Sequence, residues 1–451
     1  MARYEQSRTC VTLGVVLGFL VCAAAADEQS LNLEEVPAWT VPGFASGQAA
    51  TCKPQPDPNV RAYPVLKSDK PVYGSVQFGS FEQERDLTLL YFFVADESAG
   101  PGTGYDRLYV DLNGDRDLRN DAPVAPKSDW PQQLSRRHVA VEKEVLFESI
   151  GIPLPYGAAG RRPVEMVARL HSLKGGGGML SFVPLKARRG RIEIAGQPYD
   201  VFLGQEQPIC GWFDHPGTSF YLVPKSGADG PGAPVASTTL MMMPCLGQTY
   251  YRFAATPAGD KLLVRPYEGP LGEFRVSPKW GTDALTVSGY LVSRDARIRV
   301  SGPQCRLPVG DYSLRSLTVT HDKLTFSVQP NVHVDGGFRA KLYHPPAYPI
   351  AIRSDTCFVL DFSHPPQMIF SSPPRNRRAR PGENLFVVAV LTDPVLDFAL
   401  CDLRYDSLPA AGPKESAAQA WARKWNATLR PQVTIARADG QIVAQGTMDY
   451  G

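Results

Sequence analysis

Several features are missing from this 451-residue sequence, and each absence excludes a class of protein. It contains no H-E-x-x-H zinc motif, no P-loop, no G-x-G-x-x-G fingerprint and no G-x-S-x-G nucleophile elbow. No C-x-x-C pair occurs, which excludes the usual thioredoxin-like and zinc-knuckle sites. The 47 basic and 45 acidic residues nearly balance at net +2, so the overall charge does not indicate a nucleic-acid partner.

The composition favours short strands over a helical bundle. Hydrophobic residues make up 43% of the chain, which is enough to bury several cores and excludes a disordered protein. The 40 glycines and 41 prolines indicate many turns. At roughly 100–200 residues per domain, this length predicts two to four domains.

The N-terminus has the pattern of an export signal. Arg3 and Arg8 precede an apolar run over residues 11–26, which ends in the small residues Ala24 to Ala26. A charged start, a short apolar centre and small residues before Asp27 are typical of a cleaved signal peptide. The run is shorter than the roughly 20 residues of a membrane-spanning helix, although a retained anchor is the alternative. We therefore expect a secreted, periplasmic or cell-surface protein with no transmembrane span in its mature chain.

Export would leave an even number of cysteines. Removal of residues 1–26 also removes Cys10 and Cys22, and an oxidising compartment permits disulfides among the rest. Cys357 and Cys401 both lie in strand-like runs and are the favoured pair, while buried free thiols are the alternative. The cysteines that remain are Cys52, Cys210, Cys245, Cys305, Cys357 and Cys401.

The apolar pattern predicts a mostly β, multi-domain protein of antiparallel sandwich or barrel modules. The run LTLLYFFVA at 87–95 is short enough for a fully buried strand, and hairpins are expected around Ala195-Gly196 and Asp439-Gly440. One helix, Ser416 to Leu429, is expected as an insertion in an immunoglobulin-like C-terminal sandwich. The predicted division is a signal peptide (1–26), a loosely ordered lead-in (27–60), an N-terminal β region (61–225), a linker (226–236), a middle β domain (237–370), a second linker (371–380) and the C-terminal sandwich (381–451).

One motif carries recognisable chemistry, the segment DLNGDRDLRND at 111–121. Carboxylate and amide side chains at alternate positions can turn inward from a tight loop, and oxygen ligands of this kind suit Ca²⁺. The predicted ligands are Asp111, Asn113, Asp115, Asp117 and Asp121, with possible help from Asp96 or Glu97. Gly114 and Ala122 depart from the EF-hand positions, so a strand-flanked structural calcium loop is expected instead. The alternative is a solvated turn at Asn113-Gly114.

The segment GYDRLYVDLNGDRDLRND also resembles exported bacterial β-rich proteins of unknown function that carry D-x-N-x-D loops. The stretch Pro308 to Tyr312 and the closing VTIARADGQIVAQG are similar to them too. This resemblance implies β domains with acidic loops and no particular activity. We expect a binding or scaffolding protein of the cell envelope whose partner is a glycan or an envelope protein. The alternative is an extracellular hydrolase acting on polysaccharide or another polymer through a carboxylate pair.

An aromatic platform for sugar rings is a further hypothesis. Trp212 and Phe213 precede Phe220 and Tyr221 by a few residues, and aromatic faces can stack on sugar rings. The alternative is that these rings pack in a core.

Overall fold

The fold is mostly β, as the composition predicts, and its sheets are antiparallel except where the strand Leu271–Ser277 pairs in parallel with Cys357–Asp361. In the described residues the helical elements are two short 3₁₀ turns, η1 (Ala38–Thr40) and η3 (Gln132–Leu134). The helix predicted for Ser416 to Leu429 lies outside the described residues. The computed structural model describes residues 28–42, 47–79, 89–134, 141–156, 160–173, 178–205, 209–215, 217–225, 236–277, 285–322, 324–329, 332–335, 339–342, 349–372, 378, 380, 383, 388–393, 395–396, 398–405, 432–437 and 439–447.

The first sandwich packs a four-stranded sheet, in the order β3-β9-β8-β7, against the three-stranded sheet β4-β5-β6. Phe93, Leu108, Phe147 and Phe182 lie in the core between the sheets and are fully buried. Val94 points to the other side of β5 and is equally buried, which explains the unbroken apolar run of this strand. The strands are β3 (Gln48–Cys52), β4 (Val72–Phe78), β5 (Leu89–Asp96), β6 (Arg107–Val110), β7 (Val141–Pro155), β8 (Arg161–Leu173) and β9 (Gly178–Pro184).

The second sandwich packs the sheet β13-β12-β11-β10-β2 against the sheet β1-β16-β15-β14. Val201, Phe220 and Leu262 are fully buried between them. The predicted hairpin at Ala195-Gly196 joins β10 to β11, and both residues adopt positive φ. The strands are β1 (Gln29–Asn32), β2 (Glu34–Pro37), β10 (Lys186–Ile194), β11 (Gln197–Gly204), β12 (Ser219–Pro224), β13 (Ala236–Thr239), β14 (Cys245–Leu246), β15 (Thr249–Ala255) and β16 (Lys261–Pro266).

The chain order of these two sandwiches differs from the predicted division. The expected loose lead-in at 27–60 instead contains β1, β2 and β3, and β1 pairs with β16 while β2 pairs with β10. The first sandwich is therefore inserted between two parts of the second. Across the expected linker at 226–236, β12 pairs with β13, so this segment connects neighbouring strands of one sheet.

The third sandwich packs the three-stranded sheet β20-β17-β26 against a large sheet in which β25 pairs with β21. Phe274, Ile298, Val319 and Leu360 are fully buried in its core. The large sheet runs in the order β19-β18-β21-β22-β29-β28-β27. The strands are β17 (Leu271–Ser277), β18 (Leu285–Val292), β19 (Arg297–Ser301), β20 (Gln304–Pro308), β21 (Gly310–His321), β22 (Leu324–Gln329), β25 (Ile350–Ile352), β26 (Cys357–Asp361), β27 (Gln367–Ser372), β28 (Val388–Asp393) and β29 (Phe398–Tyr405).

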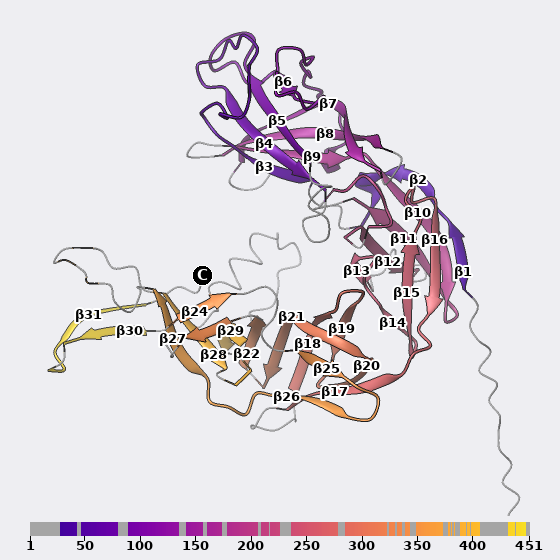
Figure 1. The fold of residues 1–451 in the computed structure, drawn as a ribbon, viewed down its shortest axis with the longest axis vertical. Coiled ribbons are helices and arrows are strands. Elements are labelled where there is room, and N and C mark those ends of the chain that lie inside the picture. Colours follow the sequence, from indigo (N-terminus) through magenta and orange to yellow (C-terminus); the bar gives the residue numbers. More distant parts are fainter. Residues whose placement is uncertain are drawn as a thin grey trace, which may run out of the picture.

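The three sandwiches follow one another along an arc, and a separate hairpin projects from its C-terminal end (Figure 1). This hairpin pairs β30 (Gln432–Ala436) with β31 (Ile442–Thr447) around Asp439-Gly440, as predicted. A second two-stranded sheet pairs β23 (Val332–Asp335) with β24 (Arg339–Leu342). The expected boundary at 371–380 does not separate two domains, because β28 and β29 belong to the large sheet of the third sandwich. The immunoglobulin-like assignment stays a prediction, and residues 406–431 lie outside the described part. Within that part, no helix is long and apolar enough to cross a membrane.

Candidate metal centre and a basic pocket

The acidic loop at 111–121 starts where β6 ends and is anchored at several points. Asp111 is only 1% exposed, and its backbone N–H donates to the carbonyl of Phe92 in β5 at 2.9 Å. Leu118 is fully buried, and its N–H donates to the carbonyl of Ala62 at 3.0 Å. Beyond the loop, the backbone of Val124 pairs with Leu108 in both directions. The loop conformation is therefore set by the first sandwich as well as by local sequence.

Within the loop, alternate side chains accept hydrogen bonds from backbone N–H groups that follow them. Asp111 uses both carboxylate oxygens, accepting from Gly114 at 2.9 Å and from Arg116 at 3.0 Å. Asn113, Asp115 and Asp117 each accept from the N–H two residues further on, at 2.8–3.1 Å. Such turns explain why Asn and Asp occur at every second position.

Asp121 is the carboxylate with the least internal support. Its Oδ1 accepts from the N–H of Leu112 at 3.3 Å, while its buried Oδ2 has no hydrogen-bond partner in the described part of the chain. Burial raises the pKa of Asp121 to about 6, and the nearby charges of Asp111, Asp115 and Asp117 act in the same direction. Negative charge therefore accumulates around Asp121 without a cation from the described residues beside it.

Asp117 is held differently. Arg119 binds its carboxylate with two nitrogen atoms, Nε at 2.9 Å and Nη2 at 2.6 Å. The hydrogen bonds from Arg119 lower the pKa of Asp117 to about 2. On the same side of the loop, the amide groups of Asn113 and Asn120 donate to Oδ2 of Asp115 at 3.1 and 2.7 Å.

The five predicted ligands share one loop, and the charges of Asp111, Asp115 and Asp117 act on Asp121. No group of three or more His, Cys, Asp or Glu side chains within the described ranges has the arrangement of a metal site. Asp111 and Asp121 both accept hydrogen bonds from backbone N–H groups of the loop. Asp117 is engaged by Arg119, which sequence spacing alone did not indicate.

The suggestion that Asp96 or Glu97 assists this loop is wrong. Asp96 pairs with Arg107 in the β5-β6 ladder, whereas Asp111 lies at the opposite end of β6. Asp111 lies four positions after Arg107, which is roughly 13 Å along an extended strand at the usual rise per residue. The carboxylate of Asp96 accepts instead from the backbone N–H groups of Lys67 and Ser68.

Cys357 and Cys401 are both free thiols, which contradicts the favoured pairing of these two residues. Cys357 lies in β26 of the three-stranded sheet, while Cys401 lies in β29 of the large sheet. Cys52 and Cys210 are buried, and burial raises the pKa of each thiol to about 12. Both remain protonated near neutral pH, which makes them poor nucleophiles and metal ligands.

The aromatic platform is also wrong as a continuous surface. Phe220 is fully buried in the second core, where it contacts Phe253 at a ring-centroid distance of 4.5 Å. Tyr221 and Phe213 are buried as well. A strand with one face in solvent would alternate between buried and exposed side chains. β12 does not, because both of its faces are covered.

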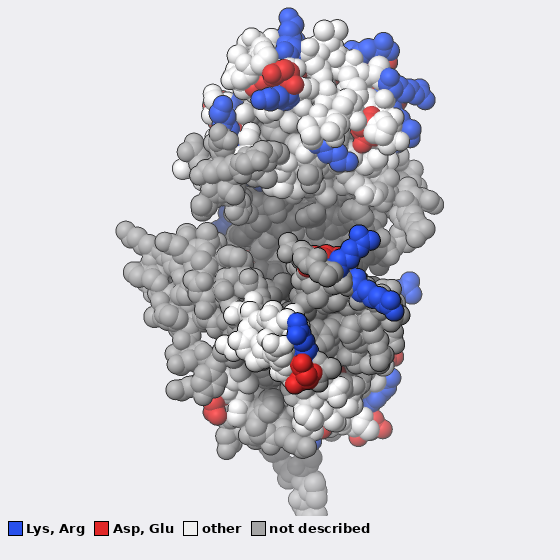
Figure 2. All heavy atoms as spheres, turned by 90° about the vertical axis from the view of Figure 1, so that its left-hand side faces the viewer, with Lys and Arg blue, Asp and Glu red and all other residues white. Residues whose placement is uncertain are grey.

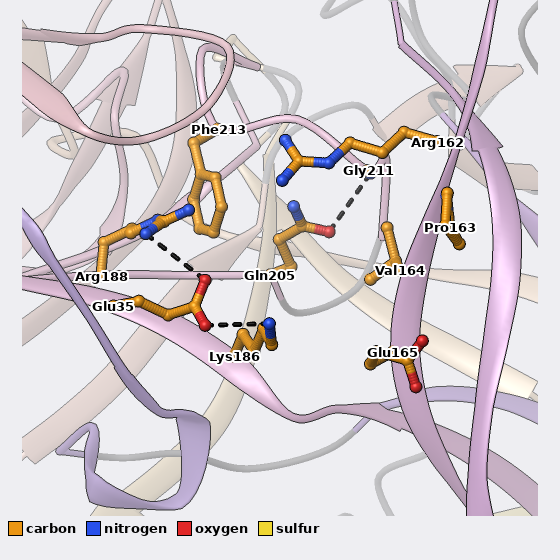
Figure 3. A pocket seen from close by; sticks show the side chains of 10 residues that line it. All are labelled: Glu35, Arg162, Pro163, Val164, Glu165, Lys186, Arg188, Gln205, Gly211 and Phe213. Atoms are coloured by element: carbon orange, nitrogen blue, oxygen red, sulfur yellow. Dashed lines mark hydrogen bonds and ion pairs between the residues drawn. The ribbon is translucent and has the colours of Figure 1, made fainter.

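The structure also shows a basic pocket that the sequence interpretation did not single out. It lies between β8 of the first sandwich and β2 and β10 of the second (Figure 3). The available signal is the basic run of β10, which contains Lys186, Arg188, Arg189 and Arg191. The residues around the pocket are Glu35, Arg162, Pro163, Val164, Glu165, Lys186, Arg188, Gln205, Gly211 and Phe213.

Charges of both signs are dispersed over the described part of the face shown in Figure 2. Comparison of the chain with protein-family models, curated proteins and solved structures finds no match.

Proposed function

We propose that this chain is an exported binding or scaffolding protein of the cell envelope, and that one Ca²⁺ stabilises its first sandwich at the acidic loop. The observation that carries the calcium proposal is the buried Oδ2 of Asp121, which lacks a hydrogen-bond partner among the described residues. A buried carboxylate oxygen without a partner is costly, and a cation would remove that cost.

The remaining loop oxygens are compatible with this role. A carboxylate has about four lone-pair sites, so Asp111 and Asp115 can accept backbone N–H groups and still offer lone pairs to an ion. The amide oxygen of Asn113 has the same capacity. Ca²⁺ takes six to eight oxygen ligands in flexible geometry, with water completing the set. Its role would be structural, since β6 and β5 anchor the loop and place it next to the first core.

Thermal unfolding of the mature chain tests the calcium proposal. Calcium at about 100 times its dissociation constant should stabilise the folded state by about 2.7 kcal/mol. This stabilisation should raise the melting temperature of the first sandwich by roughly 5–10 °C relative to protein in chelator. Asp121→Asn should abolish most of this difference without lowering the melting temperature in chelator, because the amide oxygen can still accept from the Leu112 N–H while the charge at the unpartnered Oδ2 is removed.

Asp129→Asn is the matched control, since Asp129 is an exposed acid outside the loop, 3.8 Å from the Lys127 ammonium. It should retain the full response to calcium. Identical melting of the wild-type chain in calcium and in chelator would remove the calcium proposal.

Export rests on the N-terminal pattern of Arg3, Arg8 and the apolar run that ends at Ala26. When the full chain is expressed in a bacterial host, N-terminal sequencing of the product outside the cytoplasm should begin at Asp27. Retention of an uncut N-terminus would favour the membrane-anchored alternative.

The basic pocket does not favour the hydrolase alternative. Its carboxylate Glu35 is 2.9 Å from the Lys186 ammonium, whose hydrogen bond lowers the pKa of Glu35. A general acid in a glycosidase needs a raised pKa instead. Binding without catalysis is therefore the function that these residues support best.

A further inference from the structure

The basic pocket contains an amide group whose orientation is set by the backbone. The N–H of Gly211 donates to Oε1 of Gln205 at 3.2 Å. Because this N–H needs an acceptor, the other end of the amide, Nε2, must be the donor that faces the pocket. Figure 3 shows this nitrogen directed toward the guanidinium of Arg162.

Gly211 is adapted to hold this arrangement. It adopts a φ of +88°, and a Cβ at this position would lie 2.8 Å from Cβ of Leu154. Gln205 itself is only 9% exposed, so its side chain has little freedom to turn away. The donor that it presents is therefore part of the folded structure rather than a mobile surface group.

Positive charge exceeds negative charge around this amide. Glu35 lies 2.9 Å from Lys186 and 3.5 Å from Arg188, and the charge of Arg162 also favours the ionised form of Glu35. The second carboxylate, Glu165, points away from these cations in Figure 3. Three cations thus surround one carboxylate, and the lining carries one net positive charge even when Glu165 is counted.

We propose that this pocket binds an oxyanion, the carboxylate or phosphate group of an acidic ligand. Arg162 and Nε2 of Gln205 are both donors, and Figure 3 shows them directed toward each other. A ligand oxygen placed between them would accept from both, with Lys186 and Arg188 supplying further positive charge.

The size of the pocket is compatible with such a group. Its cavity volume is about 90 Å³, which is enough to admit a carboxylate or phosphate group. Phe213 forms an apolar wall, with the Arg188 guanidinium 5.7 Å from its ring centroid. The carbon framework next to the anionic group can pack against this wall. The site involves none of the acidic-loop residues, so the inference goes beyond the calcium proposal.

Titration calorimetry of the mature chain, in buffer containing chelator, tests this inference independently of calcium. Inorganic phosphate represents a phosphate-bearing ligand and glucuronate represents a carboxylate-bearing sugar. We expect at least one of them to bind, and binding should weaken as the ionic strength rises. Arg162→Gln should weaken that binding at least about tenfold, because a charge-assisted hydrogen bond is lost.

Arg161→Gln is the matched control, because it removes the same charge from the adjacent residue of β8, whose side chain points to the opposite face. It should leave the affinity unchanged. Gln205→Glu preserves the acceptor for Gly211 but places a negative charge in the pocket, so it should abolish binding while far-ultraviolet circular dichroism shows a folded chain. If neither anion binds, or if Arg161→Gln weakens binding as much as Arg162→Gln, the inference is overturned.

Discussion

At the scale of single residues, a buried carboxylate organises the loop between β5 and β6. Glu97 is 8% exposed and accepts a hydrogen bond from the Ser68 hydroxyl at 2.8 Å. It also accepts from the N–H groups of Gly102 and Gly104, each at 2.9 Å. Burial acts to raise the pKa of Glu97, but these hydrogen bonds together outweigh burial and lower it below its ordinary value of 4.5.

This shift predicts how acid affects stability. Since the folded-state pKa of Glu97 is below its unfolded value, its contribution is fully present above about pH 4.5 and is lost as the pH falls through the lowered folded-state pKa. Glu97→Gln should therefore reduce the free energy of unfolding at neutral pH by about 1–3 kcal/mol and by less in acid. Chemical denaturation followed across this pH range measures the difference. Asp69→Asn, at an exposed acid nearby, should leave the profile unchanged, and a constant loss at every pH would contradict the argument.

At the scale of elements, the sequence predicts those elements whose turn residues and apolar pattern lie close together along the chain. The hairpins at Ala195-Gly196 and Asp439-Gly440 were predictable because turn residues and flanking apolar runs lie together in the sequence. The strand β1 was not, because it has mostly exposed positions and pairs with β16, more than 200 residues later. A strand of this kind is specified by its partner rather than by its own pattern.

The acidic loop shows the same division between local and distant information. Its period of two predicted a tight loop with alternate side chains turned inward, and in the structure these side chains accept hydrogen bonds from backbone N–H groups of the loop. The placement of Asp96 depended on the β5-β6 register, and the pocket residue Arg162 met Lys186 and Gln205 only through the packing of two sandwiches. Contacts between segments that are distant in sequence produce no periodic pattern of residues along the chain.

At the scale of the whole molecule, the insertion of one sandwich into another links distant segments. Leu33 lies between β1 and β2, its N–H donates to the carbonyl of Asp260 at 2.7 Å, and its side chain packs in the second core. The chain then forms the whole first sandwich before returning to β10. Residues that come first in the sequence therefore complete a core that is otherwise formed about 150 residues later.

This topology predicts which sandwich loses stability when a buried side chain near the N-terminus is shortened. Leu33→Ala should destabilise the second sandwich by about 2–4 kcal/mol, since Leu33 is only 7% exposed. Hydrogen exchange should become faster in β10, β15 and β16, while β5 and β6 of the first sandwich keep their protection. Leu108→Ala, in the first core, should give the reverse pattern. Faster exchange in β5 and β6 after Leu33→Ala would mean that the two sandwiches unfold as one cooperative unit, because the two chain crossings between them would then couple their cores.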